Sequence, residues 1–149
     1  MPLPNLLSMI EQLVALPSIS SYDPKHDQSN LPMVQQLAEW AEGLGFSVTV
    51  QQVSARKANL LAVLGDASDR NGLVLSGHTD TVPYDPDLWQ SDPFRLADRD
   101  QRLYGLGVAD MKAFFALALT AAGQVDRNQL QCPLVLLATA DEESSMSGV

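Results

Sequence analysis

The stretch LVLSGHTD, residues 73–80, joins three apolar residues to a cluster of polar ones. A short apolar run bounded by turn residues predicts a fully buried strand, and Leu73–Leu75 has the composition of a parallel or central one. The polar residues from Gly77 to Asp80 therefore follow the carboxyl end of a strand. Open α/β sheets bind their ligands at that edge, so this stretch indicates both a fold class and the place of a site.

Two other polar clusters stand beside apolar elements in the same way. Pro133–Ala138 (PLVLLA) predicts a second buried strand, and Asp141-Glu142-Glu143 follows it. Asp110 begins a segment, 110–125, that is apolar almost all round and predicts a helix between two layers. The clusters are evenly spaced, from residue 78 to 110 and from 110 to 142, with one strand–helix unit between successive clusters. We expect all three to converge at one edge of the sheet.

Hydrophobic periodicity places the other elements and sets the fold class. Helix start signals make Ser29 the predicted N-cap of a second helix, and a polar segment at 65–72 predicts a turn. Helices that alternate with buried strands predict a layered α/β domain with a mixed, mostly parallel sheet. The predicted elements are helices at 4–16, 29–44 and 110–125, and strands at 46–53, 59–64, 73–75 and 133–138.

The stretch from Ser76 to about Gly107 carries no clear periodicity and is predicted to be a long loop. Loops of this length in compact domains are usually functional or disordered. Three aromatic residues, Trp89, Phe94 and Tyr104, favour an ordered loop.

Composition excludes several classes of protein. With 149 residues, 46 % of them hydrophobic and 18 % charged, the chain has the balance of one globular domain rather than of a disordered segment. A net charge of −9 argues against nucleic acid as a partner. The most apolar stretch, 113–122, is half of the roughly 20 residues that a membrane span needs, and the N-terminus lacks signal-peptide features. A single cysteine, Cys132, suits a reducing cytoplasm and is expected in the core.

One imidazole and several carboxylates are a ligand set for zinc, cobalt or manganese. Because His78 and Asp80 stand two residues apart on an extended segment, the carboxylate can orient the imidazole ring or share the metal. Each group also has an ordinary structural use: Asp110 suits a helix N-cap, and Glu142-Glu143 suits a solvated surface. The residue types alone leave a metal site and a structural role both open.

Three motifs resemble the signatures of the two-metal, co-catalytic zinc amidohydrolases and exopeptidases. The segments are Ser76–Pro83 (SGHTDTVP), Tyr104–Lys112 (YGLGVADMK) and Thr139–Ser144 (TADEES), in family order and at family spacing. This family includes succinyl-diaminopimelate desuccinylase, carboxypeptidase G and aminoacylase. The resemblance implies a three-layer α/β/α zinc-peptidase-like catalytic domain and hydrolysis with two divalent metal ions, zinc or cobalt.

By this resemblance each residue of the clusters takes a role. His78 binds one metal ion, Asp110 bridges both, and Glu143 binds the second ion. Glu142 is the general base, and Asp80 supports catalysis by orienting His78. The resemblance also implies a cis peptide bond after Asp110 and a homodimer for a full-length form.

Within the family, the residues around Trp89, Asp92–Phe94, Leu103–Gly107 and Asp110–Ala116 are most similar to the acetylornithine deacetylase branch. That branch implies a cytoplasmic enzyme of arginine biosynthesis, with N2-acetyl-L-ornithine as a small-molecule substrate and L-ornithine and acetate as products. The alternative is a related hydrolase of N-acyl amino acids or dipeptides.

The chain departs from the family pattern in length. The family has a further carboxylate ligand, a late histidine ligand and a smaller dimerisation domain, none of which is found in residues 1–149. The other histidine, His26, stands in a polar loop and is not expected to bind metal. We therefore expect residues 1–149 to be the N-terminal portion of the catalytic domain, with the apolar strand 133–138 left at a bare edge. Alone, they should neither turn over substrate nor hold zinc tightly. An inactive truncated form or a non-catalytic binding module is the alternative.

Overall fold

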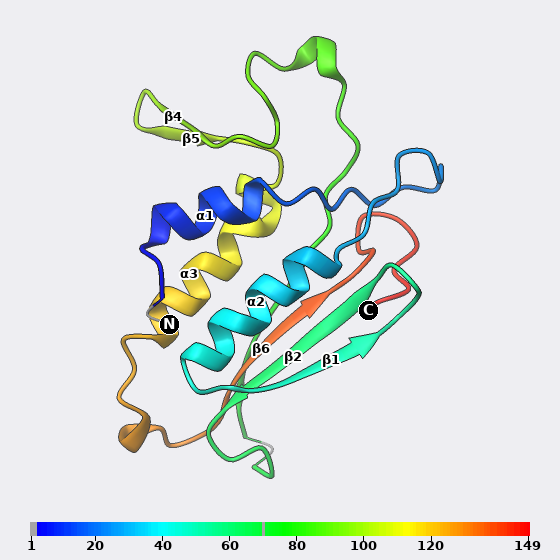
Figure 1. Ribbon diagram of the computed structural model, residues 1–149. Helices are drawn as coiled ribbons and strands as arrows, with labels where there is room; N and C mark the ends of the chain where they lie inside the picture. Colours follow the sequence, from blue (N-terminus) through cyan, green and yellow to red (C-terminus); the bar gives the residue numbers. More distant parts are fainter. Residues whose placement is uncertain (1–2, 70) are drawn as a thin grey trace.

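The computed structural model describes residues 3–69 and 71–149, so residue 70 of the predicted turn at 65–72 lies outside the described residues (Figure 1). A four-stranded sheet in the order β1-β2-β6-β3 carries the helices. The main elements are α1 (Leu6–Val14), α2 (Leu31–Gly43), β1 (Ser47–Gln52), β2 (Ala58–Leu64), β3 (Leu73–His78), α3 (Ala113–Ala122) and β6 (Leu134–Thr139). All seven correspond to elements that the sequence predicts, with ends that differ by a few residues.

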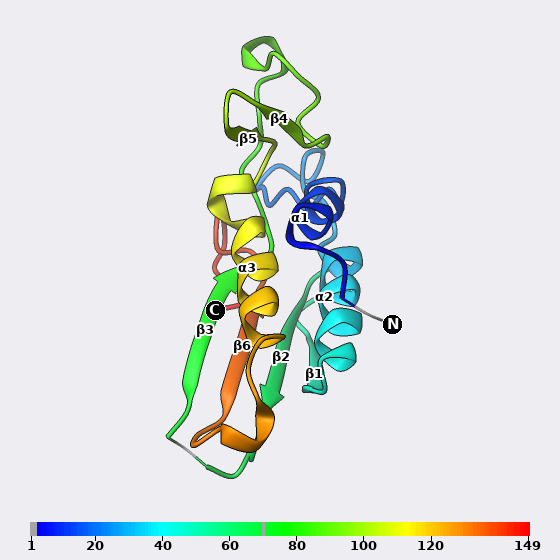
Figure 2. The ribbon, with the colours of Figure 1, turned by 90° about the vertical axis from the view of Figure 1, so that its left-hand side faces the viewer.

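The helices cover one face of the sheet in the part of the chain that the structure describes (Figure 2). Along β2 the residues alternate: Leu60 and Ala62 are fully buried under α2, whereas Leu61 between them is 40 % exposed on the other face. Helix α3 packs on β3, and α1 packs on α3. The described residues thus build two of the three layers that the resemblance implies, and the apolar core lies between the helices and the sheet.

The prediction of a mostly parallel sheet is wrong. β1 pairs with β2 and β2 with β6 in antiparallel fashion, and only β3 and β6 are parallel. The links β1–β2 and β2–β3 are short, and short links connect antiparallel strands, whereas the crossover through α3 brings β6 back parallel to β3.

Strand β6 enters the sheet between β2 and β3, which corrects two further expectations. The strand predicted at 133–138 is central and has no bare edge. Strand β3 is instead an edge of the described sheet, and Leu73 and Val74, expected to be buried, are both more than half exposed. An apolar run shows that a strand is buried on average, but it does not show which strands lie on either side of it.

Hydrogen bonds of Asn30 connect the first turn of helix α2 to the sheet. Asn30, rather than the predicted Ser29, is at the N-cap, although the Ser29 hydroxyl still accepts a hydrogen bond from the Leu31 N–H. The fully buried Asn30 amide donates to the Ala58 carbonyl and to the Thr79 hydroxyl, and its oxygen accepts from the Ala58 N–H. One side chain thus joins a helix, β2 and the segment that follows β3.

The predicted long loop contains more structure than its sequence indicates. β3 continues to His78, a short 3-10 turn η1 (Pro86–Leu88) follows, and β4 (Ala97–Arg99) pairs with β5 (Arg102–Tyr104) as a hairpin. The hairpin turn has no glycine, so it gives no turn signal. The expectation of order is confirmed: Tyr84 packs edge-on against Trp89 and Phe94, at centroid distances of 6.2 and 5.7 Å.

The predicted helix 110–125 divides into two parts. A wide turn, η2 (Val108–Lys112), contains a cis peptide bond between Asp110 and Met111, as the resemblance implies, and α3 follows it. Gly107, before η2, has φ +80°, and a Cβ there would lie 2.7 Å from the Thr81 methyl group, so this turn requires glycine. Asp110 is therefore not a helix N-cap.

Two residues, Leu117 and Cys132, are more exposed than the sequence predicts. Leu117 of α3 is 54 % exposed, so this apolar helix is not covered all round by the described residues. Cys132, expected in the core, is exposed. Among the described residues, no helix combines the length and the hydropathy that crossing a membrane requires.

Candidate metal centre

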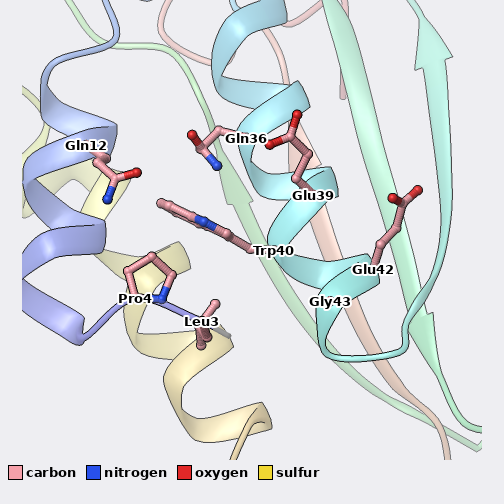
Figure 3. A pocket seen from close by; sticks show the side chains of 8 residues that line it. All are labelled: Leu3, Pro4, Gln12, Gln36, Glu39, Trp40, Glu42 and Gly43. Carbon is pink, nitrogen blue, oxygen red and sulfur yellow. The ribbon is translucent and has the colours of Figure 1, made fainter. Parts of the chain in front are cut away.

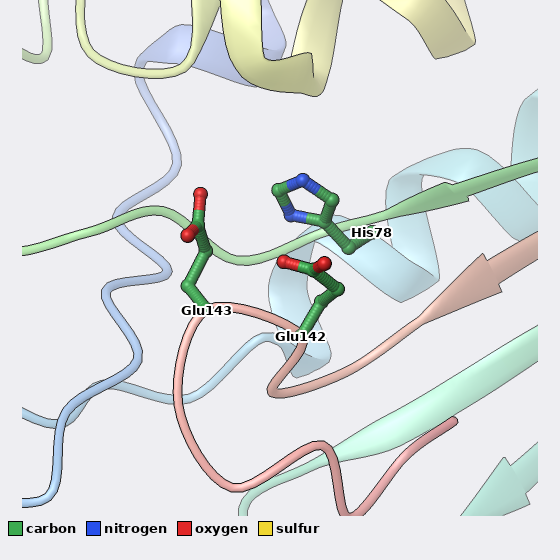
Figure 4. A group of neighbouring side chains, drawn as sticks. All are labelled: His78, Glu142 and Glu143. Carbon is green, nitrogen blue, oxygen red and sulfur yellow. The ribbon is translucent and has the colours of Figure 1, made fainter.

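The three polar clusters converge as predicted. His78 ends β3 and pairs in register with Thr139 of β6, so the turn after β6 carries Glu142 and Glu143 directly beside the imidazole (Figure 4). One ligand atom from each of His78, Glu142 and Glu143 lies within 4.8 Å of the other two. Asp110 Oδ1, from η2, lies 3.0 Å from His78 Nε2.

The two nitrogens of His78 have different partners. Nδ1 lies 3.0 Å from the main-chain oxygen of Asp80, which can only accept a hydrogen bond, so Nδ1 carries a proton and donates it. Nε2 lies beside the Asp110 carboxylate. Because Nδ1 is occupied by its hydrogen bond, Nε2 is the nitrogen that can bind a metal ion. The interaction with the Asp80 carboxylate, helped by Asp110, outweighs burial and raises the pKa of His78 to about 9.

Asp80 connects the histidine to the glutamates. Its side chain is fully buried, with one carboxylate oxygen 3.6 Å from His78 Nδ1. The same carboxylate accepts hydrogen bonds from the N–H groups of Glu142, at 3.2 Å, and Glu143, at 3.0 Å. Burial alone would raise the pKa of Asp80, but the hydrogen bonds from His78 and these two amides lower it overall. Asp80 thus orients both His78, as expected, and the Glu142–Glu143 turn.

The carboxylates of the site repel one another. Burial raises the pKa of Glu143, as do the charges of Asp110, Glu142 and Asp80, with His78 opposing them. A cation placed among these groups would relieve the repulsion, and one imidazole with several carboxylates is a zinc or cobalt ligand set. The residues present therefore fit a divalent metal ion.

The other candidate residues lie outside this group. His26 is exposed in its loop, with Nε2 4.0 Å from an Asp23 carboxylate oxygen. Sequence reasoning missed Lys57, a buried residue whose ammonium group lies 2.8 Å from the carboxylates of both Asp27 and Asp141. A lysine in a polar turn gives no local signal of burial, so only the tertiary structure reveals it.

Two hollows adjoin the site. One, of about 430 Å³, is lined by Asn59, His78, Glu142 and Met146, among others. The second, of about 340 Å³, lies beside Asp110 and Glu143 and is lined in part by the Trp89 ring. The first hollow thus borders Glu142 and the second borders Glu143.

A hollow of about 510 Å³ lies elsewhere, between α1 and α2 (Figure 3). The Trp40 ring and the side chains of Gln12, Glu39 and Glu42 line it. Its lining has two carboxylates and no histidine or cysteine, so it offers a much poorer ligand set than the edge of the sheet.

The raised pKa of His78 predicts how pH affects the stability of metal-free protein. Because the folded value of about 9 lies above the ordinary 6.5, His78 stabilises the fold fully below about pH 6.5 and less as the pH rises through 9. We expect the difference in free energy of unfolding between wild type and His78→Gln to shrink between about pH 6 and pH 9.5. Urea titrations with a chelator measure it.

Comparing variants is necessary because Lys112 also titrates in this window: burial lowers its pKa to about 8. Its contribution is common to wild type and variant and cancels in the difference. The exposed His26→Gln is the matched control for the loss of an imidazole. A wild type to His78→Gln difference that stays constant or grows with pH contradicts the assignment.

A mixed α/β domain that presents a histidine and several carboxylates at the carboxyl edge of its sheet has the form of a metallohydrolase catalytic domain. Residues 74–149 match the family described as peptidase family M20/M25/M40, and the chain belongs to that family. The resemblance expected from the three motifs is therefore confirmed, and this family indicates the use of a divalent metal ion.

Individual relatives agree with this assignment. The chain is 52 % identical to acetylornithine deacetylase of Proteus mirabilis (strain HI4320) and 49 % identical to that of Pasteurella multocida (strain Pm70), each over 148 residues. Both alignments cover 98 % of the chain, which spans 38 % of the length of each relative.

Solved structures show the same fold. Human carnosine dipeptidase 1 matches with a TM-score of 0.82 and 24 % identity, over 97 % of this chain and 33 % of that one. An M20 family metallo-carboxypeptidase from Sulfolobus solfataricus matches with a TM-score of 0.78 and 24 % identity, over 95 % and 32 %. The zinc-peptidase-like fold class is thereby confirmed.

Proposed function

We propose that the chain is the N-terminal, metal-binding portion of the catalytic domain of a hydrolase that cleaves N2-acetyl-L-ornithine into L-ornithine and acetate. The observation that carries the proposal is the convergence of His78, Glu142 and Glu143 within 4.8 Å, beside Asp110, in a chain about half identical to acetylornithine deacetylases. Identity to the dipeptidase of known structure is only 24 %, which favours the deacetylase over a dipeptide hydrolase.

The metal ions of the proposal are two divalent ions, zinc or cobalt. His78 would hold one through Nε2, Asp110 would bridge both with its two oxygens, and Glu143 would hold the second. When bound, such ions lower the pKa of a water molecule and polarise a carbonyl group. Metal binding requires His78 to lose its Nε2 proton, so metal affinity falls at low pH.

Glu142 is the general base and acid of the proposed reaction. Its carboxylate accepts a proton from the attacking water, whose oxygen forms a bond to the acetyl carbon. The amide C–N bond then breaks, and Glu142 returns the proton to the leaving α-amine, so that acetate and ornithine form without another reactant. Asp80 takes no proton in this scheme; it holds His78 and the amides of Glu142 and Glu143 in place.

We also propose a setting for the enzyme. Because the proposed reaction produces ornithine from its acetyl derivative, we assign the enzyme to arginine biosynthesis in the cytoplasm, with a small molecule as the substrate. The net charge of −9 argues against nucleic acid or an anionic membrane surface as partners. A homodimer is proposed for a full-length form.

A chimera tests the proposed function. Residues 1–149 replace the corresponding 38 % of the Proteus mirabilis deacetylase, and release of ornithine is measured with added Zn²⁺ or Co²⁺. We expect the chimera to hydrolyse N2-acetyl-L-ornithine and to lose activity with a chelator, whereas the 149 residues alone should show no turnover. A folded chimera that binds metal but does not hydrolyse this substrate, or prefers a dipeptide, contradicts the proposal.

A further inference from the structure

A buried lysine stands behind the candidate metal centre without touching it. Lys57, in the turn before β2, is only 3 % exposed. Its Nζ lies 2.8 Å from Asp27 Oδ1, in the segment between α1 and α2, and 2.8 Å from Asp141 Oδ1, after β6. A lysine loses much hydration when it is buried, so such a position is stable only with well-placed anionic partners. Lys57 has two.

Asp141 is the centre of the turn that carries the glutamates. It has φ +58°, a left-handed conformation that the turn needs at this point. Besides Lys57, its carboxylate accepts hydrogen bonds from the hydroxyls of Ser20 and Ser147, both at 3.1 Å. Its main-chain oxygen accepts from the Met146 N–H at 2.7 Å, which closes the turn. A movement of Asp141 would therefore move Glu142 and Glu143.

Two charged residues that hold the Glu142–Glu143 turn act on different atoms of it. Asp80, in front, holds the main-chain amides of Glu142 and Glu143. Lys57 holds the side chain of Asp141. With the two amides and the Asp141 side chain held, the two glutamate side chains leave the turn toward His78 (Figure 4).

The positive charge of Lys57 also offsets the repulsion among the surrounding carboxylates. The turn brings Asp141, Glu142 and Glu143 close to Asp80 and Asp110, and these negative charges oppose a compact arrangement. The Lys57 ammonium is the cation that lies between Asp27 and Asp141. Without it, these two carboxylates would face each other across a buried gap, and the turn would shift to separate them.

We propose that Lys57 is a positioning residue that sets the metal affinity of the site by fixing Asp141 and, through it, the Glu142–Glu143 turn. The role in metal binding rests on the proposed function, whereas the role in fixing the turn does not. Supporting residues behind metal ligands typically change metal affinity by about 10- to 100-fold when they are removed.

The test uses the chimera with the Proteus mirabilis deacetylase, because residues 1–149 alone are not expected to hold metal tightly, and it makes two measurements. Lys57→Met removes the charge at similar length, and Asp141→Asn keeps the shape of the turn; Lys25→Met, an exposed lysine, is the matched control. Titration with Co²⁺ gives metal affinity, and amide hydrogen exchange reports on the Glu142 and Glu143 N–H groups. We expect Lys57→Met to weaken Co²⁺ binding by about 10-fold or more and to speed exchange at both amides by a similar factor. Exchange at the core amides of β2 and β6 should stay near that of wild type.

A double variant tests whether the lysine acts through Asp141. In Lys57→Met/Asp141→Asn the repulsion with Asp27 is removed, so the double variant should lose less affinity than the two single losses combined. Unchanged Co²⁺ affinity and unchanged exchange in a folded Lys57→Met protein overturn the proposal. If the chimera without these substitutions binds no Co²⁺, the proposed metal site fails, and the exchange measurement alone decides whether Lys57 fixes the turn. Should Lys57→Met not fold, Asp141→Asn decides by the same two measurements.

Discussion

Replacing Glu142 by glutamine in the active chimera should lower hydrolysis of N2-acetyl-L-ornithine by about 100- to 10,000-fold. Glutamine keeps the size of the side chain but cannot accept a proton from water or return one to the leaving amine. Because Glu142 is assigned to proton transfer and not to metal binding, the metal content of the variant should equal that of the parent. Steady-state rates and metal analysis of the purified protein measure both effects.

The control for this variant is Glu42→Gln, which changes an exposed glutamate on α2, far from the edge of the sheet that carries the site. Two results would reverse the assignment. Near-parental turnover would show that Glu142 is not the base. Loss of metal together with activity would show that Glu142 is itself a ligand, as its place within 4.8 Å of His78 and Glu143 also permits.

Asp80→Ala should lower both the free energy of unfolding and the metal affinity of the protein. The carboxylate is fully buried and accepts hydrogen bonds from the amides of Glu142 and Glu143, so its removal leaves these donors without their partner and removes the negative charge beside His78. Breaking a buried charged interaction of this kind costs about 3–5 kcal/mol in free energy of unfolding. Metal affinity should also fall by about 10- to 100-fold, because both ligand segments lose their orientation.

Urea unfolding of the 149-residue chain and Co²⁺ titration of the chimera measure these effects. Asp98→Ala, which changes an exposed aspartate on β4, should be close to wild type in both. Asp80→Asn separates charge from shape: it should retain part of the stability but little of the metal affinity. If Asp80→Ala unfolds at the same urea concentration as Asp98→Ala, Asp80 does not hold the site together.

The place of the site could be predicted from sequence because strand ends are visible in it. His78 and Glu142 each follow an apolar strand directly, and the strand-end rule brings such residues to one edge whatever the order of the strands. The order itself could not be predicted. The runs 73–75 and 133–138 are equally apolar, yet one is at the edge of the described sheet and the other is central.

Residues whose role depends on distant partners were the ones that sequence reasoning missed. Lys57 is separated by 30 residues from Asp27 and by 84 from Asp141, and no local pattern connects them. Asn30 was overlooked as well, because its side chain serves β2 and Thr79 rather than its own helix. The hairpin of β4 and β5 was missed for a different reason, because its turn contains no glycine and so gives no turn signal.

The place of β6 in the sheet also determines when the site can form. Because β6 lies between β2 and β3, those two strands have no hydrogen bonds to each other and stay unjoined until β6 has been synthesised. His78 pairs with Thr139 across 61 residues of chain, and contacts of such separation form late and slowly during folding. A ribosome-bound chain that ends before β6 therefore exposes His78 without its glutamates, and metal capture should follow, not precede, completion of the sheet.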